Sequence, residues 1–487
     1  MSGPACKQVV VLGAGQAGLA AAYRAARRGI AVSVLEGRDT VGGIGSSFEL
    51  DGIQVDYGSH RFNAECDPEV LADLYELLGD ELLTRPKNSR LRLRGRWIHF
   101  PMGPGDLLRL PGGFALGFAA DLARAGLRRV VRRGPEREAD FPELLESDLG
   151  RTLCRDFYFP YARKTWGLPP EQLSVPPAQR HRSGNLLGNA LRNGASALLG
   201  RKPPGADRFL YPRGGFGQIG QRYYEAAREA GAKFTLGARV KCVERDDTRV
   251  RGVRYESDGR EHSIEAECVW STLPLTLLAR CMEPAAPPEV LDAVAGLSFR
   301  GVILIYLVLE QDRFSDYDTH FIPDAEIPLT RLSEPKNYSG AVEPRGRTVL
   351  CAELPCDPDA PEFELSDEEL GRLALRCLDA AGLPVRAPLR GVVTRRLRRA
   401  YPVYRVGSDV HLARIDQWLR RFEGLVSFGL QGLFAHDDSH HILHMAYSAV
   451  DSIGPDGRFD WERWQASRRL FEARVAQFLR TMNGISI

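Results

Sequence analysis

The chain of 487 residues is 44% hydrophobic, so it can bury a large core, and its length favours two domains. Its 65 basic and 63 acidic residues nearly cancel to a net charge of +2, which argues against a nucleic-acid partner. The nine cysteines form no CxxC pair, which argues against a disulfide framework or zinc site and favours the cytoplasm. No apolar run approaches the ~18 residues of a membrane span, and the first motif starts too near Met1 to leave room for a signal peptide.

Residues 9–43 carry the first motif. An apolar run at 9–12 is followed by three glycines, an alanine-rich helical segment and a second apolar run at 31–35 that leads to an acid. This order of strand, turn, helix and strand turns a weak glycine pattern into a strong dinucleotide-binding fingerprint. The residues that make it are Gly13, Gly15, Gly18 and Glu36.

Each of these four residues has its own physical role. Gly13 allows a tight turn, Gly15 lets the backbone approach a pyrophosphate, and Gly18 lets the helix pack closely on the strand. The start of the helix offers free N–H groups and a positive dipole end to phosphates. Glu36 stands where an acid accepts hydrogen bonds from ribose hydroxyls. A plain βαβ unit that tolerates glycines is the alternative interpretation.

The motif continues beyond the acid, which favours a flavin over a nicotinamide nucleotide. Glu36 is followed by Arg38 and by the pair Gly42 and Gly43. This extended pattern resembles that of the FAD-dependent amine oxidase superfamily. The resemblance implies bound FAD, with the arginine and the glycine pair helping to hold its diphosphate.

A second glycine-centred stretch, residues 55–62, is similar to the segment that these flavoproteins place beside the isoalloxazine ring. The resemblance implies cofactor contacts from Gly58 and Ser59. His60 is the candidate catalytic residue, because a histidine there can face flavin N5 as an acid or positioning group. The alternative is that His60 only hydrogen-bonds its own loop.

The motifs of the nucleotide domain recur in three separate places, which implies a discontinuous domain. We therefore expect an α/β protein in which a Rossmann-type FAD-binding domain carries an inserted α+β substrate domain. The expected FAD-binding parts are residues 1–85, 211–283 and 421–487, and the expected substrate parts are residues 86–210 and 284–420.

Several elements are predicted between the motifs, in chain order. Residues 90–100 alternate around a glycine and predict a β-hairpin. The helix predicted at 114–133 has a basic face that could touch an anionic membrane, although such faces are more often solvated. The other predictions are a helix at 219–230, strands at 233–243 and 251–255, a buried strand at 301–309 and a helix at 442–453.

Three stretches of the substrate domain narrow the resemblance. Residues 161–170, 328–338 and 395–404 look like stretches of UDP-galactopyranose mutases and of related protoporphyrinogen-oxidase-like proteins. An arginine fork matches phosphate or carboxylate in two bonds at once, and tyrosine hydroxyls add neutral donors. The resemblance therefore implies substrate contacts from Trp166, Arg180, Arg331, Lys336, Tyr401 and Tyr404. Two alternatives stay open: a core position for the tryptophan, and a structural Arg331–Glu334 ion pair.

The later nucleotide-binding segments are similar to known flavin contacts. The resemblance implies that the Val240 backbone pairs with the adenine and that Gly429, Asp438 and His440 lie near the ribityl chain and the flavin edge. The sequence departs from the family at the helix start, where two histidines replace an aspartate followed by histidine or glutamine. Histidines spaced by four (436, 440, 444) could gather a metal, but no HExxH-type pattern accompanies them and we expect no metal site.

These residues favour two enzymatic functions, and a third possibility is not enzymatic. The first is an FAD-dependent oxidoreductase that transfers a hydride to flavin N5 from an anionic small molecule, which could be a nucleotide sugar. The alternative is a redox-neutral, UDP-galactopyranose mutase-like isomerase that uses reduced FAD. A non-enzymatic, FAD-stabilised scaffold is the third possibility, and nothing in the sequence indicates the oligomeric state.

Overall fold

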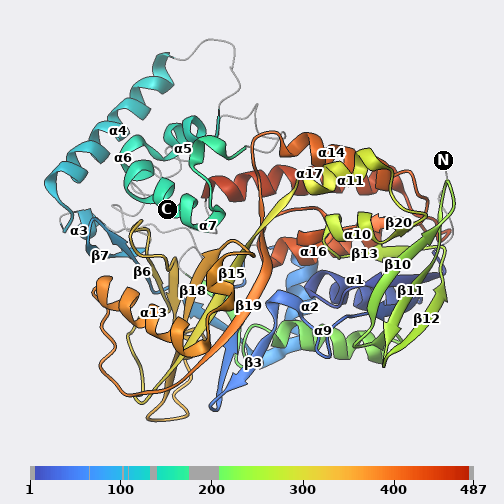
Figure 1. The fold of residues 1–487 in the computed structure, drawn as a ribbon, viewed down its shortest axis with the longest axis horizontal. Helices are drawn as coiled ribbons and strands as arrows, with labels where there is room; N and C mark the ends of the chain where they lie inside the picture. Colours follow the sequence, from blue (N-terminus) through green and yellow to red (C-terminus); the bar gives the residue numbers. More distant parts are fainter. Residues whose placement is uncertain are drawn as a thin grey trace.

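The computed structural model describes residues 6–64, 66–100, 104–107, 109–131, 140–174 and 208–481. Two halves lie side by side, each built around its own large sheet (Figure 1). Arg180 lies outside the described residues. No described helix is both long and apolar enough to cross a bilayer.

The first half is built on a five-stranded parallel sheet. Its first two strands are the apolar runs of the dinucleotide motif, and they are buried on both faces, as in other parallel sheets. The order across the sheet is β20 (Leu425–Ser427), β13 (Val269–Ser271), β1 (Gln8–Leu12), β2 (Ala31–Leu35) and β9 (Lys233–Thr235). All five strands come from the three segments assigned to the FAD-binding domain, while the exact boundaries stay a prediction.

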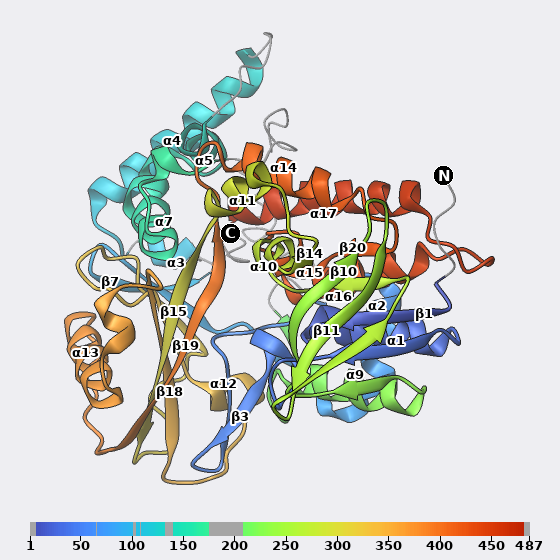
Figure 2. The same cartoon turned by 45° about the vertical axis from the view of Figure 1, so that its right-hand side comes forward.

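Helices cover this sheet and bring distant segments together. Helix α1 (Gln16–Arg27) packs against both α9 (Gln218–Glu229) and α16 (Ser439–Asp451), as Figure 2 also shows. The helix predicted at 219–230 is therefore confirmed, and the one predicted at 442–453 begins three residues earlier. Because the starts of α1 and α16 lie on one cavity, both helix dipoles point their positive ends at it.

The predicted strand at 233–243 is wrong as a single element. The structure divides it into β9 and β10 (Arg239–Arg245), which belong to different sheets. Gly237 between them has φ +67°, a left-handed conformation that ends the extended run. The second strand joins a mixed sheet, in which it pairs antiparallel with β11 (Val250–Ser257) and parallel with β14 (Met282–Glu283), and β12 (Arg260–Glu265) pairs antiparallel with β11.

The second half is built on a seven-stranded mixed sheet. The continuous apolar run predicted at 301–309 is confirmed as the buried strand β15 (Ser298–Leu309), paired on both sides. The predicted hairpin is also confirmed, with Arg94 and Gly95 in left-handed conformations at its turn. The sheet order is β19 (Leu389–Val403), β15, β18 (Thr348–Cys356), β17 (Arg331–Ser333), β16 (Thr319–Phe321), β6 (Ser89–Leu93) and β7 (Arg96–Phe100).

Helices flank the seven-stranded sheet on different sides. Helix α13 (Asp367–Ala380) packs on β15 and β19, and its capping box at Ser366 fixes its start. A helical group stands at the end of the sheet (Figures 1 and 2), formed by α4 (Gly112–Val131), α5 (Phe141–Leu149) and α7 (Phe159–Trp166). The helix predicted at 114–133 is thus confirmed as α4 as far as residue 131, since residues 132 and 133 lie outside the described residues. Contact of its basic face with a membrane stays the less favoured alternative.

Gly18 tests the close packing of α1 on the sheet. A Cβ at this position would lie 2.0 Å from the Gly13 carbonyl oxygen, which is fixed backbone. We therefore expect Gly18→Ala to lower the free energy of unfolding by about 1–3 kcal/mol or more, because overpacking moves the helix off the strand. Thermal melting and FAD retention measure the effect. Gly391→Ala is the control, since a Cβ there meets nothing within 4 Å. Equal melting temperatures would contradict the packing described.

Candidate functional site

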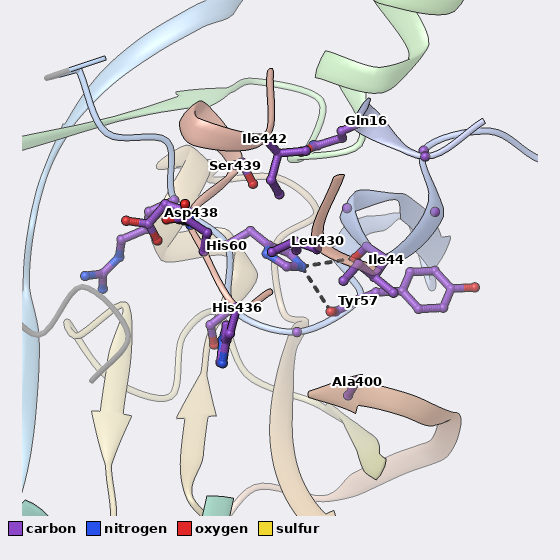
Figure 3. Close-up of a pocket in the computed structure, with 18 of the residues that line it drawn as sticks. Gln16, Ile44, Tyr57, His60, Ala400, Leu430, His436, Asp438, Ser439 and Ile442 are labelled. Atoms are coloured by element: carbon purple, nitrogen blue, oxygen red, sulfur yellow. Dashed lines mark hydrogen bonds between the residues drawn. The ribbon is translucent and has the colours of Figure 1, made fainter. Parts of the chain in front are cut away.

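A cavity of about 750 Å³ lies between the two halves. The dinucleotide turn and the glycine pair line one end of it, and strands of the seven-stranded sheet line the other. Residues 57–63 and the segment from Gly429 to Ile442 close its sides (Figure 3). One space therefore joins the expected cofactor and substrate regions.

The dinucleotide end has the features that an FAD diphosphate needs. A Cβ at Gly15 would meet no atom within 4 Å, so the backbone there borders open space. The Gly42 N–H donates to the Ala14 carbonyl at 2.8 Å, which seats the glycine pair against the first turn. Gln16 adds a buried amide nitrogen, Nε2, with no hydrogen-bond partner among the described residues. A phosphate oxygen would satisfy that donor.

Glu36 lies at the same end of the cavity. Its Oε2 accepts a hydrogen bond from the Ala14 N–H at 2.7 Å, and its Oε1 accepts one from the Arg38 N–H at 3.0 Å. Both bonds hold the carboxylate on the cavity wall, where a ribose would lie. Val240 does not line the cavity, but Ala238, two residues earlier, donates its N–H to the Glu36 carbonyl. Pairing of Val240 with adenine stays a prediction.

The loop at 57–60 is held on both sides. Ser59 donates its backbone N–H to Glu353 at 3.0 Å, and Gly58 has φ +100°. The His60 Nε2 lies 3.1 Å from the carbonyl oxygens of Ile44 and Tyr57 (Figure 3), and its ring stacks on Phe216 at 5.0 Å. This bonding favours the loop-holding alternative for His60, because the nitrogen that could act as an acid already faces two carbonyls.

The buried carboxylate of Asp56 lies directly before the loop at 57–60. Asp56 accepts hydrogen bonds from Ser47 Oγ, from Tyr211 Oη and from the Phe216 N–H, at 2.6, 2.6 and 2.9 Å. Burial raises the pKa of Asp56, although these donors oppose the rise. The three bonds join the glycine-rich turn after β8 (Arg208–Pro212) to the start of β3 (Ser47–Leu50).

The substrate end is dominated by a buried ion pair. Arg331 binds Glu353 through Nε and Nη2 at 2.9 and 2.7 Å, and the side chain of Glu353 is only 2% exposed. Burial alone would lower the pKa of Arg331, but the attraction of Glu353 raises it well above its usual value. The alternative of a structural Arg331–Glu334 ion pair is wrong as to the partner: Glu334 instead accepts bonds from the N–H groups of residues 314 and 315 and from Thr348.

Tyr401 lies beside this ion pair, and its ring stacks on His436 at 5.0 Å. Burial raises the pKa of Tyr401 to about 12, and burial, aided by Arg331, lowers the pKa of His436 to about 3. Both side chains are therefore neutral near pH 7. They give the cavity a flat wall that can donate hydrogen bonds without adding charge.

Three expected substrate contacts do not reach the cavity and are corrected here. Trp166 is buried against Phe141, with ring centroids 6.3 Å apart, so its core alternative holds. Lys336 is buried and donates its Nζ to three backbone carbonyls, those of residues 312, 344 and 347. Tyr404 donates its hydroxyl to the Phe434 carbonyl at 2.9 Å. All three side chains contact other parts of the protein and do not line the cavity.

The start of α16 forms the remaining wall. Gly429, Asp438 and His440 all line the cavity, as expected for residues near a flavin, although their contacts with FAD stay predictions. The neighbouring Asp437 accepts a 2.6 Å hydrogen bond from His441 Nδ1. Histidine 444 instead approaches Asp67 at 3.5 Å, and no group of three metal-ligating side chains occurs among the described residues.

Comparison with known proteins gives the family. The sequence model of the flavin-containing amine oxidoreductases matches residues 16–447. Coproporphyrinogen III oxidase of Propionibacterium freudenreichii is 27% identical over 91% of both chains, and the L-amino acid oxidase bordonein-L of Crotalus durissus terrificus is 26% identical over 64% of this chain and 59% of its own.

Solved structures share the fold. Reduced UDP-galactopyranose mutase superposes with a TM-score of 0.75 at 20% identity and covers 92% of this chain and 95% of its own. Putrescine oxidase bound to putrescine has a TM-score of 0.58 at 20% identity, over 92% of this chain and 99% of its own. The α/β fold expected from the sequence is thus confirmed.

The chain belongs to the flavin-containing amine oxidoreductase family. It is an FAD-dependent oxidoreductase, and the predictions of FAD as the cofactor and of an enzyme are both confirmed.

Glu353 was missed by the sequence analysis and provides a test of the site. Breaking a buried ion pair leaves an uncompensated charge, so we expect Glu353→Ala to cost about 3–5 kcal/mol of unfolding free energy. Glu353→Gln with Arg331→Met should recover much of this loss, because the amide oxygen still accepts from Ser59 and no charge remains.

Urea unfolding of the single and double variants measures the coupling between the two residues. Glu256→Gln is the control, since it removes an exposed pair with Lys241 and should leave the unfolding midpoint almost unchanged. A double variant no more stable than Glu353→Ala would show that the ion pair is not what holds this wall.

Proposed function

We propose that this enzyme oxidises a nitrogen-containing, anionic small molecule at a C–H bond on a carbon attached to the nitrogen or one atom further away, with a porphyrinogen as the first candidate. The observation that carries the proposal is the single cavity that joins the dinucleotide turn to Arg331 and Tyr401. A relative that covers 91% of both chains is named for coproporphyrinogen III oxidation, which supports the choice of candidate.

In this proposal, different residues of the chain position the flavin-side loop and orient the substrate. When bound, FAD supplies the hydride acceptor. The Ser59–Glu353 hydrogen bond holds the loop beside which the flavin ring would lie, so it fixes the distance to the substrate. Arg331 and Tyr401 orient the polar groups of the substrate, and the charge of the Arg331–Glu353 pair cancels within the protein. Anionic groups would therefore be met mainly by hydrogen bonds.

A nucleotide-sugar mutase is the second candidate, favoured by Arg331 and Tyr401 on the cavity wall. Two observations weaken it. Lys336 and Trp166 lie in the interior, and Glu353 already neutralises the arginine that would hold a diphosphate. We therefore rank oxidation first.

We also propose that the protein is located in the cytoplasm. All nine cysteines are free thiols, as is usual in a reducing compartment. A nucleic-acid partner is not expected from the balanced charge, and the proposed partner is a small molecule alone.

Anaerobic mixing of the FAD-loaded protein with coproporphyrinogen III tests the proposed function. With the FAD-loaded protein in excess, we expect the visible flavin band to bleach while the porphyrin absorption appears. Each FAD accepts two electrons from the substrate, so several FAD-loaded proteins are needed to complete one porphyrin. UDP-galactopyranose under the same conditions is the control and should leave the band unchanged. Bleaching by neither compound, with conversion of UDP-galactopyranose only after reduction by dithionite, would overturn oxidation in favour of the mutase.

A further inference from the structure

Asp438 occupies a helix-capping position without acting as a cap. It precedes Ser439, the first residue of α16, and its backbone carbonyl accepts the N–H groups of His441 and Ile442. An aspartate at this position normally accepts a further hydrogen bond through its side chain. The Asp438 carboxylate makes none, and no ion pair to it is found within the described part of the chain. Its side chain is therefore left for another partner.

The adjacent acid, Asp437, shows the opposite behaviour. Its Oδ1 accepts hydrogen bonds from His441 Nδ1 at 2.6 Å and from the Asp438 N–H at 2.8 Å, and its side chain is fully buried. These bonds fix the turn before α16. Both acids line the cavity, and the Asp437 Oδ2 has no hydrogen-bond partner among the described residues. The two differ because Asp437 is held by these two bonds through Oδ1, whereas Asp438, near His60 and His436 (Figure 3), makes no side-chain hydrogen bond.

The other carboxylates on the described cavity wall already have donors. Glu36 accepts two backbone N–H groups, and Glu353 accepts Arg331 and the Ser59 N–H. Arg61, the other arginine of the substrate region, is bound to Asp318 at 2.6 Å. A ligand in this region thus meets one carboxylate that lacks a hydrogen-bond donor. Its chemical complement is an N–H or O–H group.

The surroundings of Asp438 also suit proton transfer. Burial, together with the charge of Asp437, raises the pKa of Asp438 to about 6, against the opposing effects of His441 and Lys87. These three are the charged groups that act on it, two from its own turn and one from the segment before β6. A carboxyl group with a pKa near the working pH can both accept and release a proton.

We propose that Asp438 is the proton acceptor of the reaction and binds the N–H group of the nitrogen-containing substrate. This inference rests on the proposed function and names the chemical group that the site selects. In an amine, the C–H bond that breaks is on the carbon next to the nitrogen. In a porphyrinogen it is on the methylene bridge one atom further away, and the double bonds of the pyrrole ring shift so that the C=N bond forms within that ring. The hydrogen would leave with both electrons as hydride, for which FAD held in the cavity would be the acceptor. The N–H bond breaks, its electron pair forms the C=N bond, and its proton passes to the Asp438 carboxylate.

Asp438→Asn tests this role because asparagine keeps the size and the oxygen acceptor but cannot take a proton. In anaerobic mixing with coproporphyrinogen III, the wild type should show a flavin-reduction rate that rises with pH through about 6. The variant should lose this rise and react about 100-fold more slowly, the usual size of a general-base effect. Asp258→Asn, in an exposed turn, is the matched control and should behave as the wild type. A variant that keeps both the rise and the rate would overturn the proposal.

A binding experiment separates this inference from the proposed function. Benzylamine, which carries an N–H group, is titrated into the oxidised holoprotein and followed by the shift of the flavin spectrum. We expect Asp438→Asn to weaken binding about tenfold, since a hydrogen bond to a charged group is worth about 1.5–3 kcal/mol. If coproporphyrinogen III fails to reduce the wild type, the proposed substrate is wrong, and this titration still decides the role of Asp438. Equal affinity in the two proteins overturns that role.

The variant Asp438→Glu serves as a second test in case Asp438→Asn folds poorly. Because Asp438 makes no capping bond through its side chain, neither variant should lower the melting temperature. If Asp438→Asn is nevertheless unstable, the glutamate variant carries the test. It should retain a pH-dependent rate, because it retains a carboxyl group, and a flat profile in it would contradict proton transfer at this position.

Discussion

The buried carboxylate of Glu353 is the interaction on which the site depends. It stands on β18 in the seven-stranded sheet, yet it accepts a hydrogen bond from Ser59, which follows β4 (Ile53–Asp56). Its second oxygen binds Arg331 on the neighbouring strand. A buried charge of this kind needs both partners, because desolvation is costly when either is absent. The two requirements together hold the loop at 57–60 at one fixed place on the sheet.

At the opposite end of the cavity the constraint is steric rather than electrostatic. The close approach of α1 to the Gly13 carbonyl sets where the helix begins, and the open space at Gly15 lies directly before that helix. Backbone N–H groups and a helix dipole therefore face the position that a diphosphate would take. The residues that would bind the cofactor and those that would bind the substrate therefore line the same cavity. Hydride transfer requires the two molecules to lie a short distance apart.

The sequence was most informative where local chemistry determines structure. The glycine spacing and the acid at Glu36 predicted the nucleotide domain because their geometry is set within one βαβ unit. Motif matching in the substrate domain was less reliable. The side chains of Lys336 and Trp166 are buried in the protein interior instead of lining the cavity. Whether a side chain faces a cavity depends on strand register and on packing from distant segments. Neither property is visible in a short motif.

Glu353 and Asp438 show which properties of the site could not be predicted from the sequence alone. An acid inside the fully buried run TVLCAELPC was a visible signal that Glu353 needed a partner, but the identity of that partner depends on strand pairing. Asp438 was expected among the cofactor contacts, and the sequence alone could not separate it from Asp437. Only the hydrogen bonds at the start of α16 distinguish the acid that fixes the turn from the one whose carboxylate makes no side-chain hydrogen bond.

A crystal structure of the FAD-loaded protein tests the central claim most directly. We expect the diphosphate beside Gly15 and the Gln16 amide, the flavin ring against the loop that Ser59 anchors, and the Glu353–Arg331 pair intact. A nucleotide bound outside this cavity, or an open ion pair with Ser59 released from Glu353, would contradict the shared cavity on which the proposed chemistry depends.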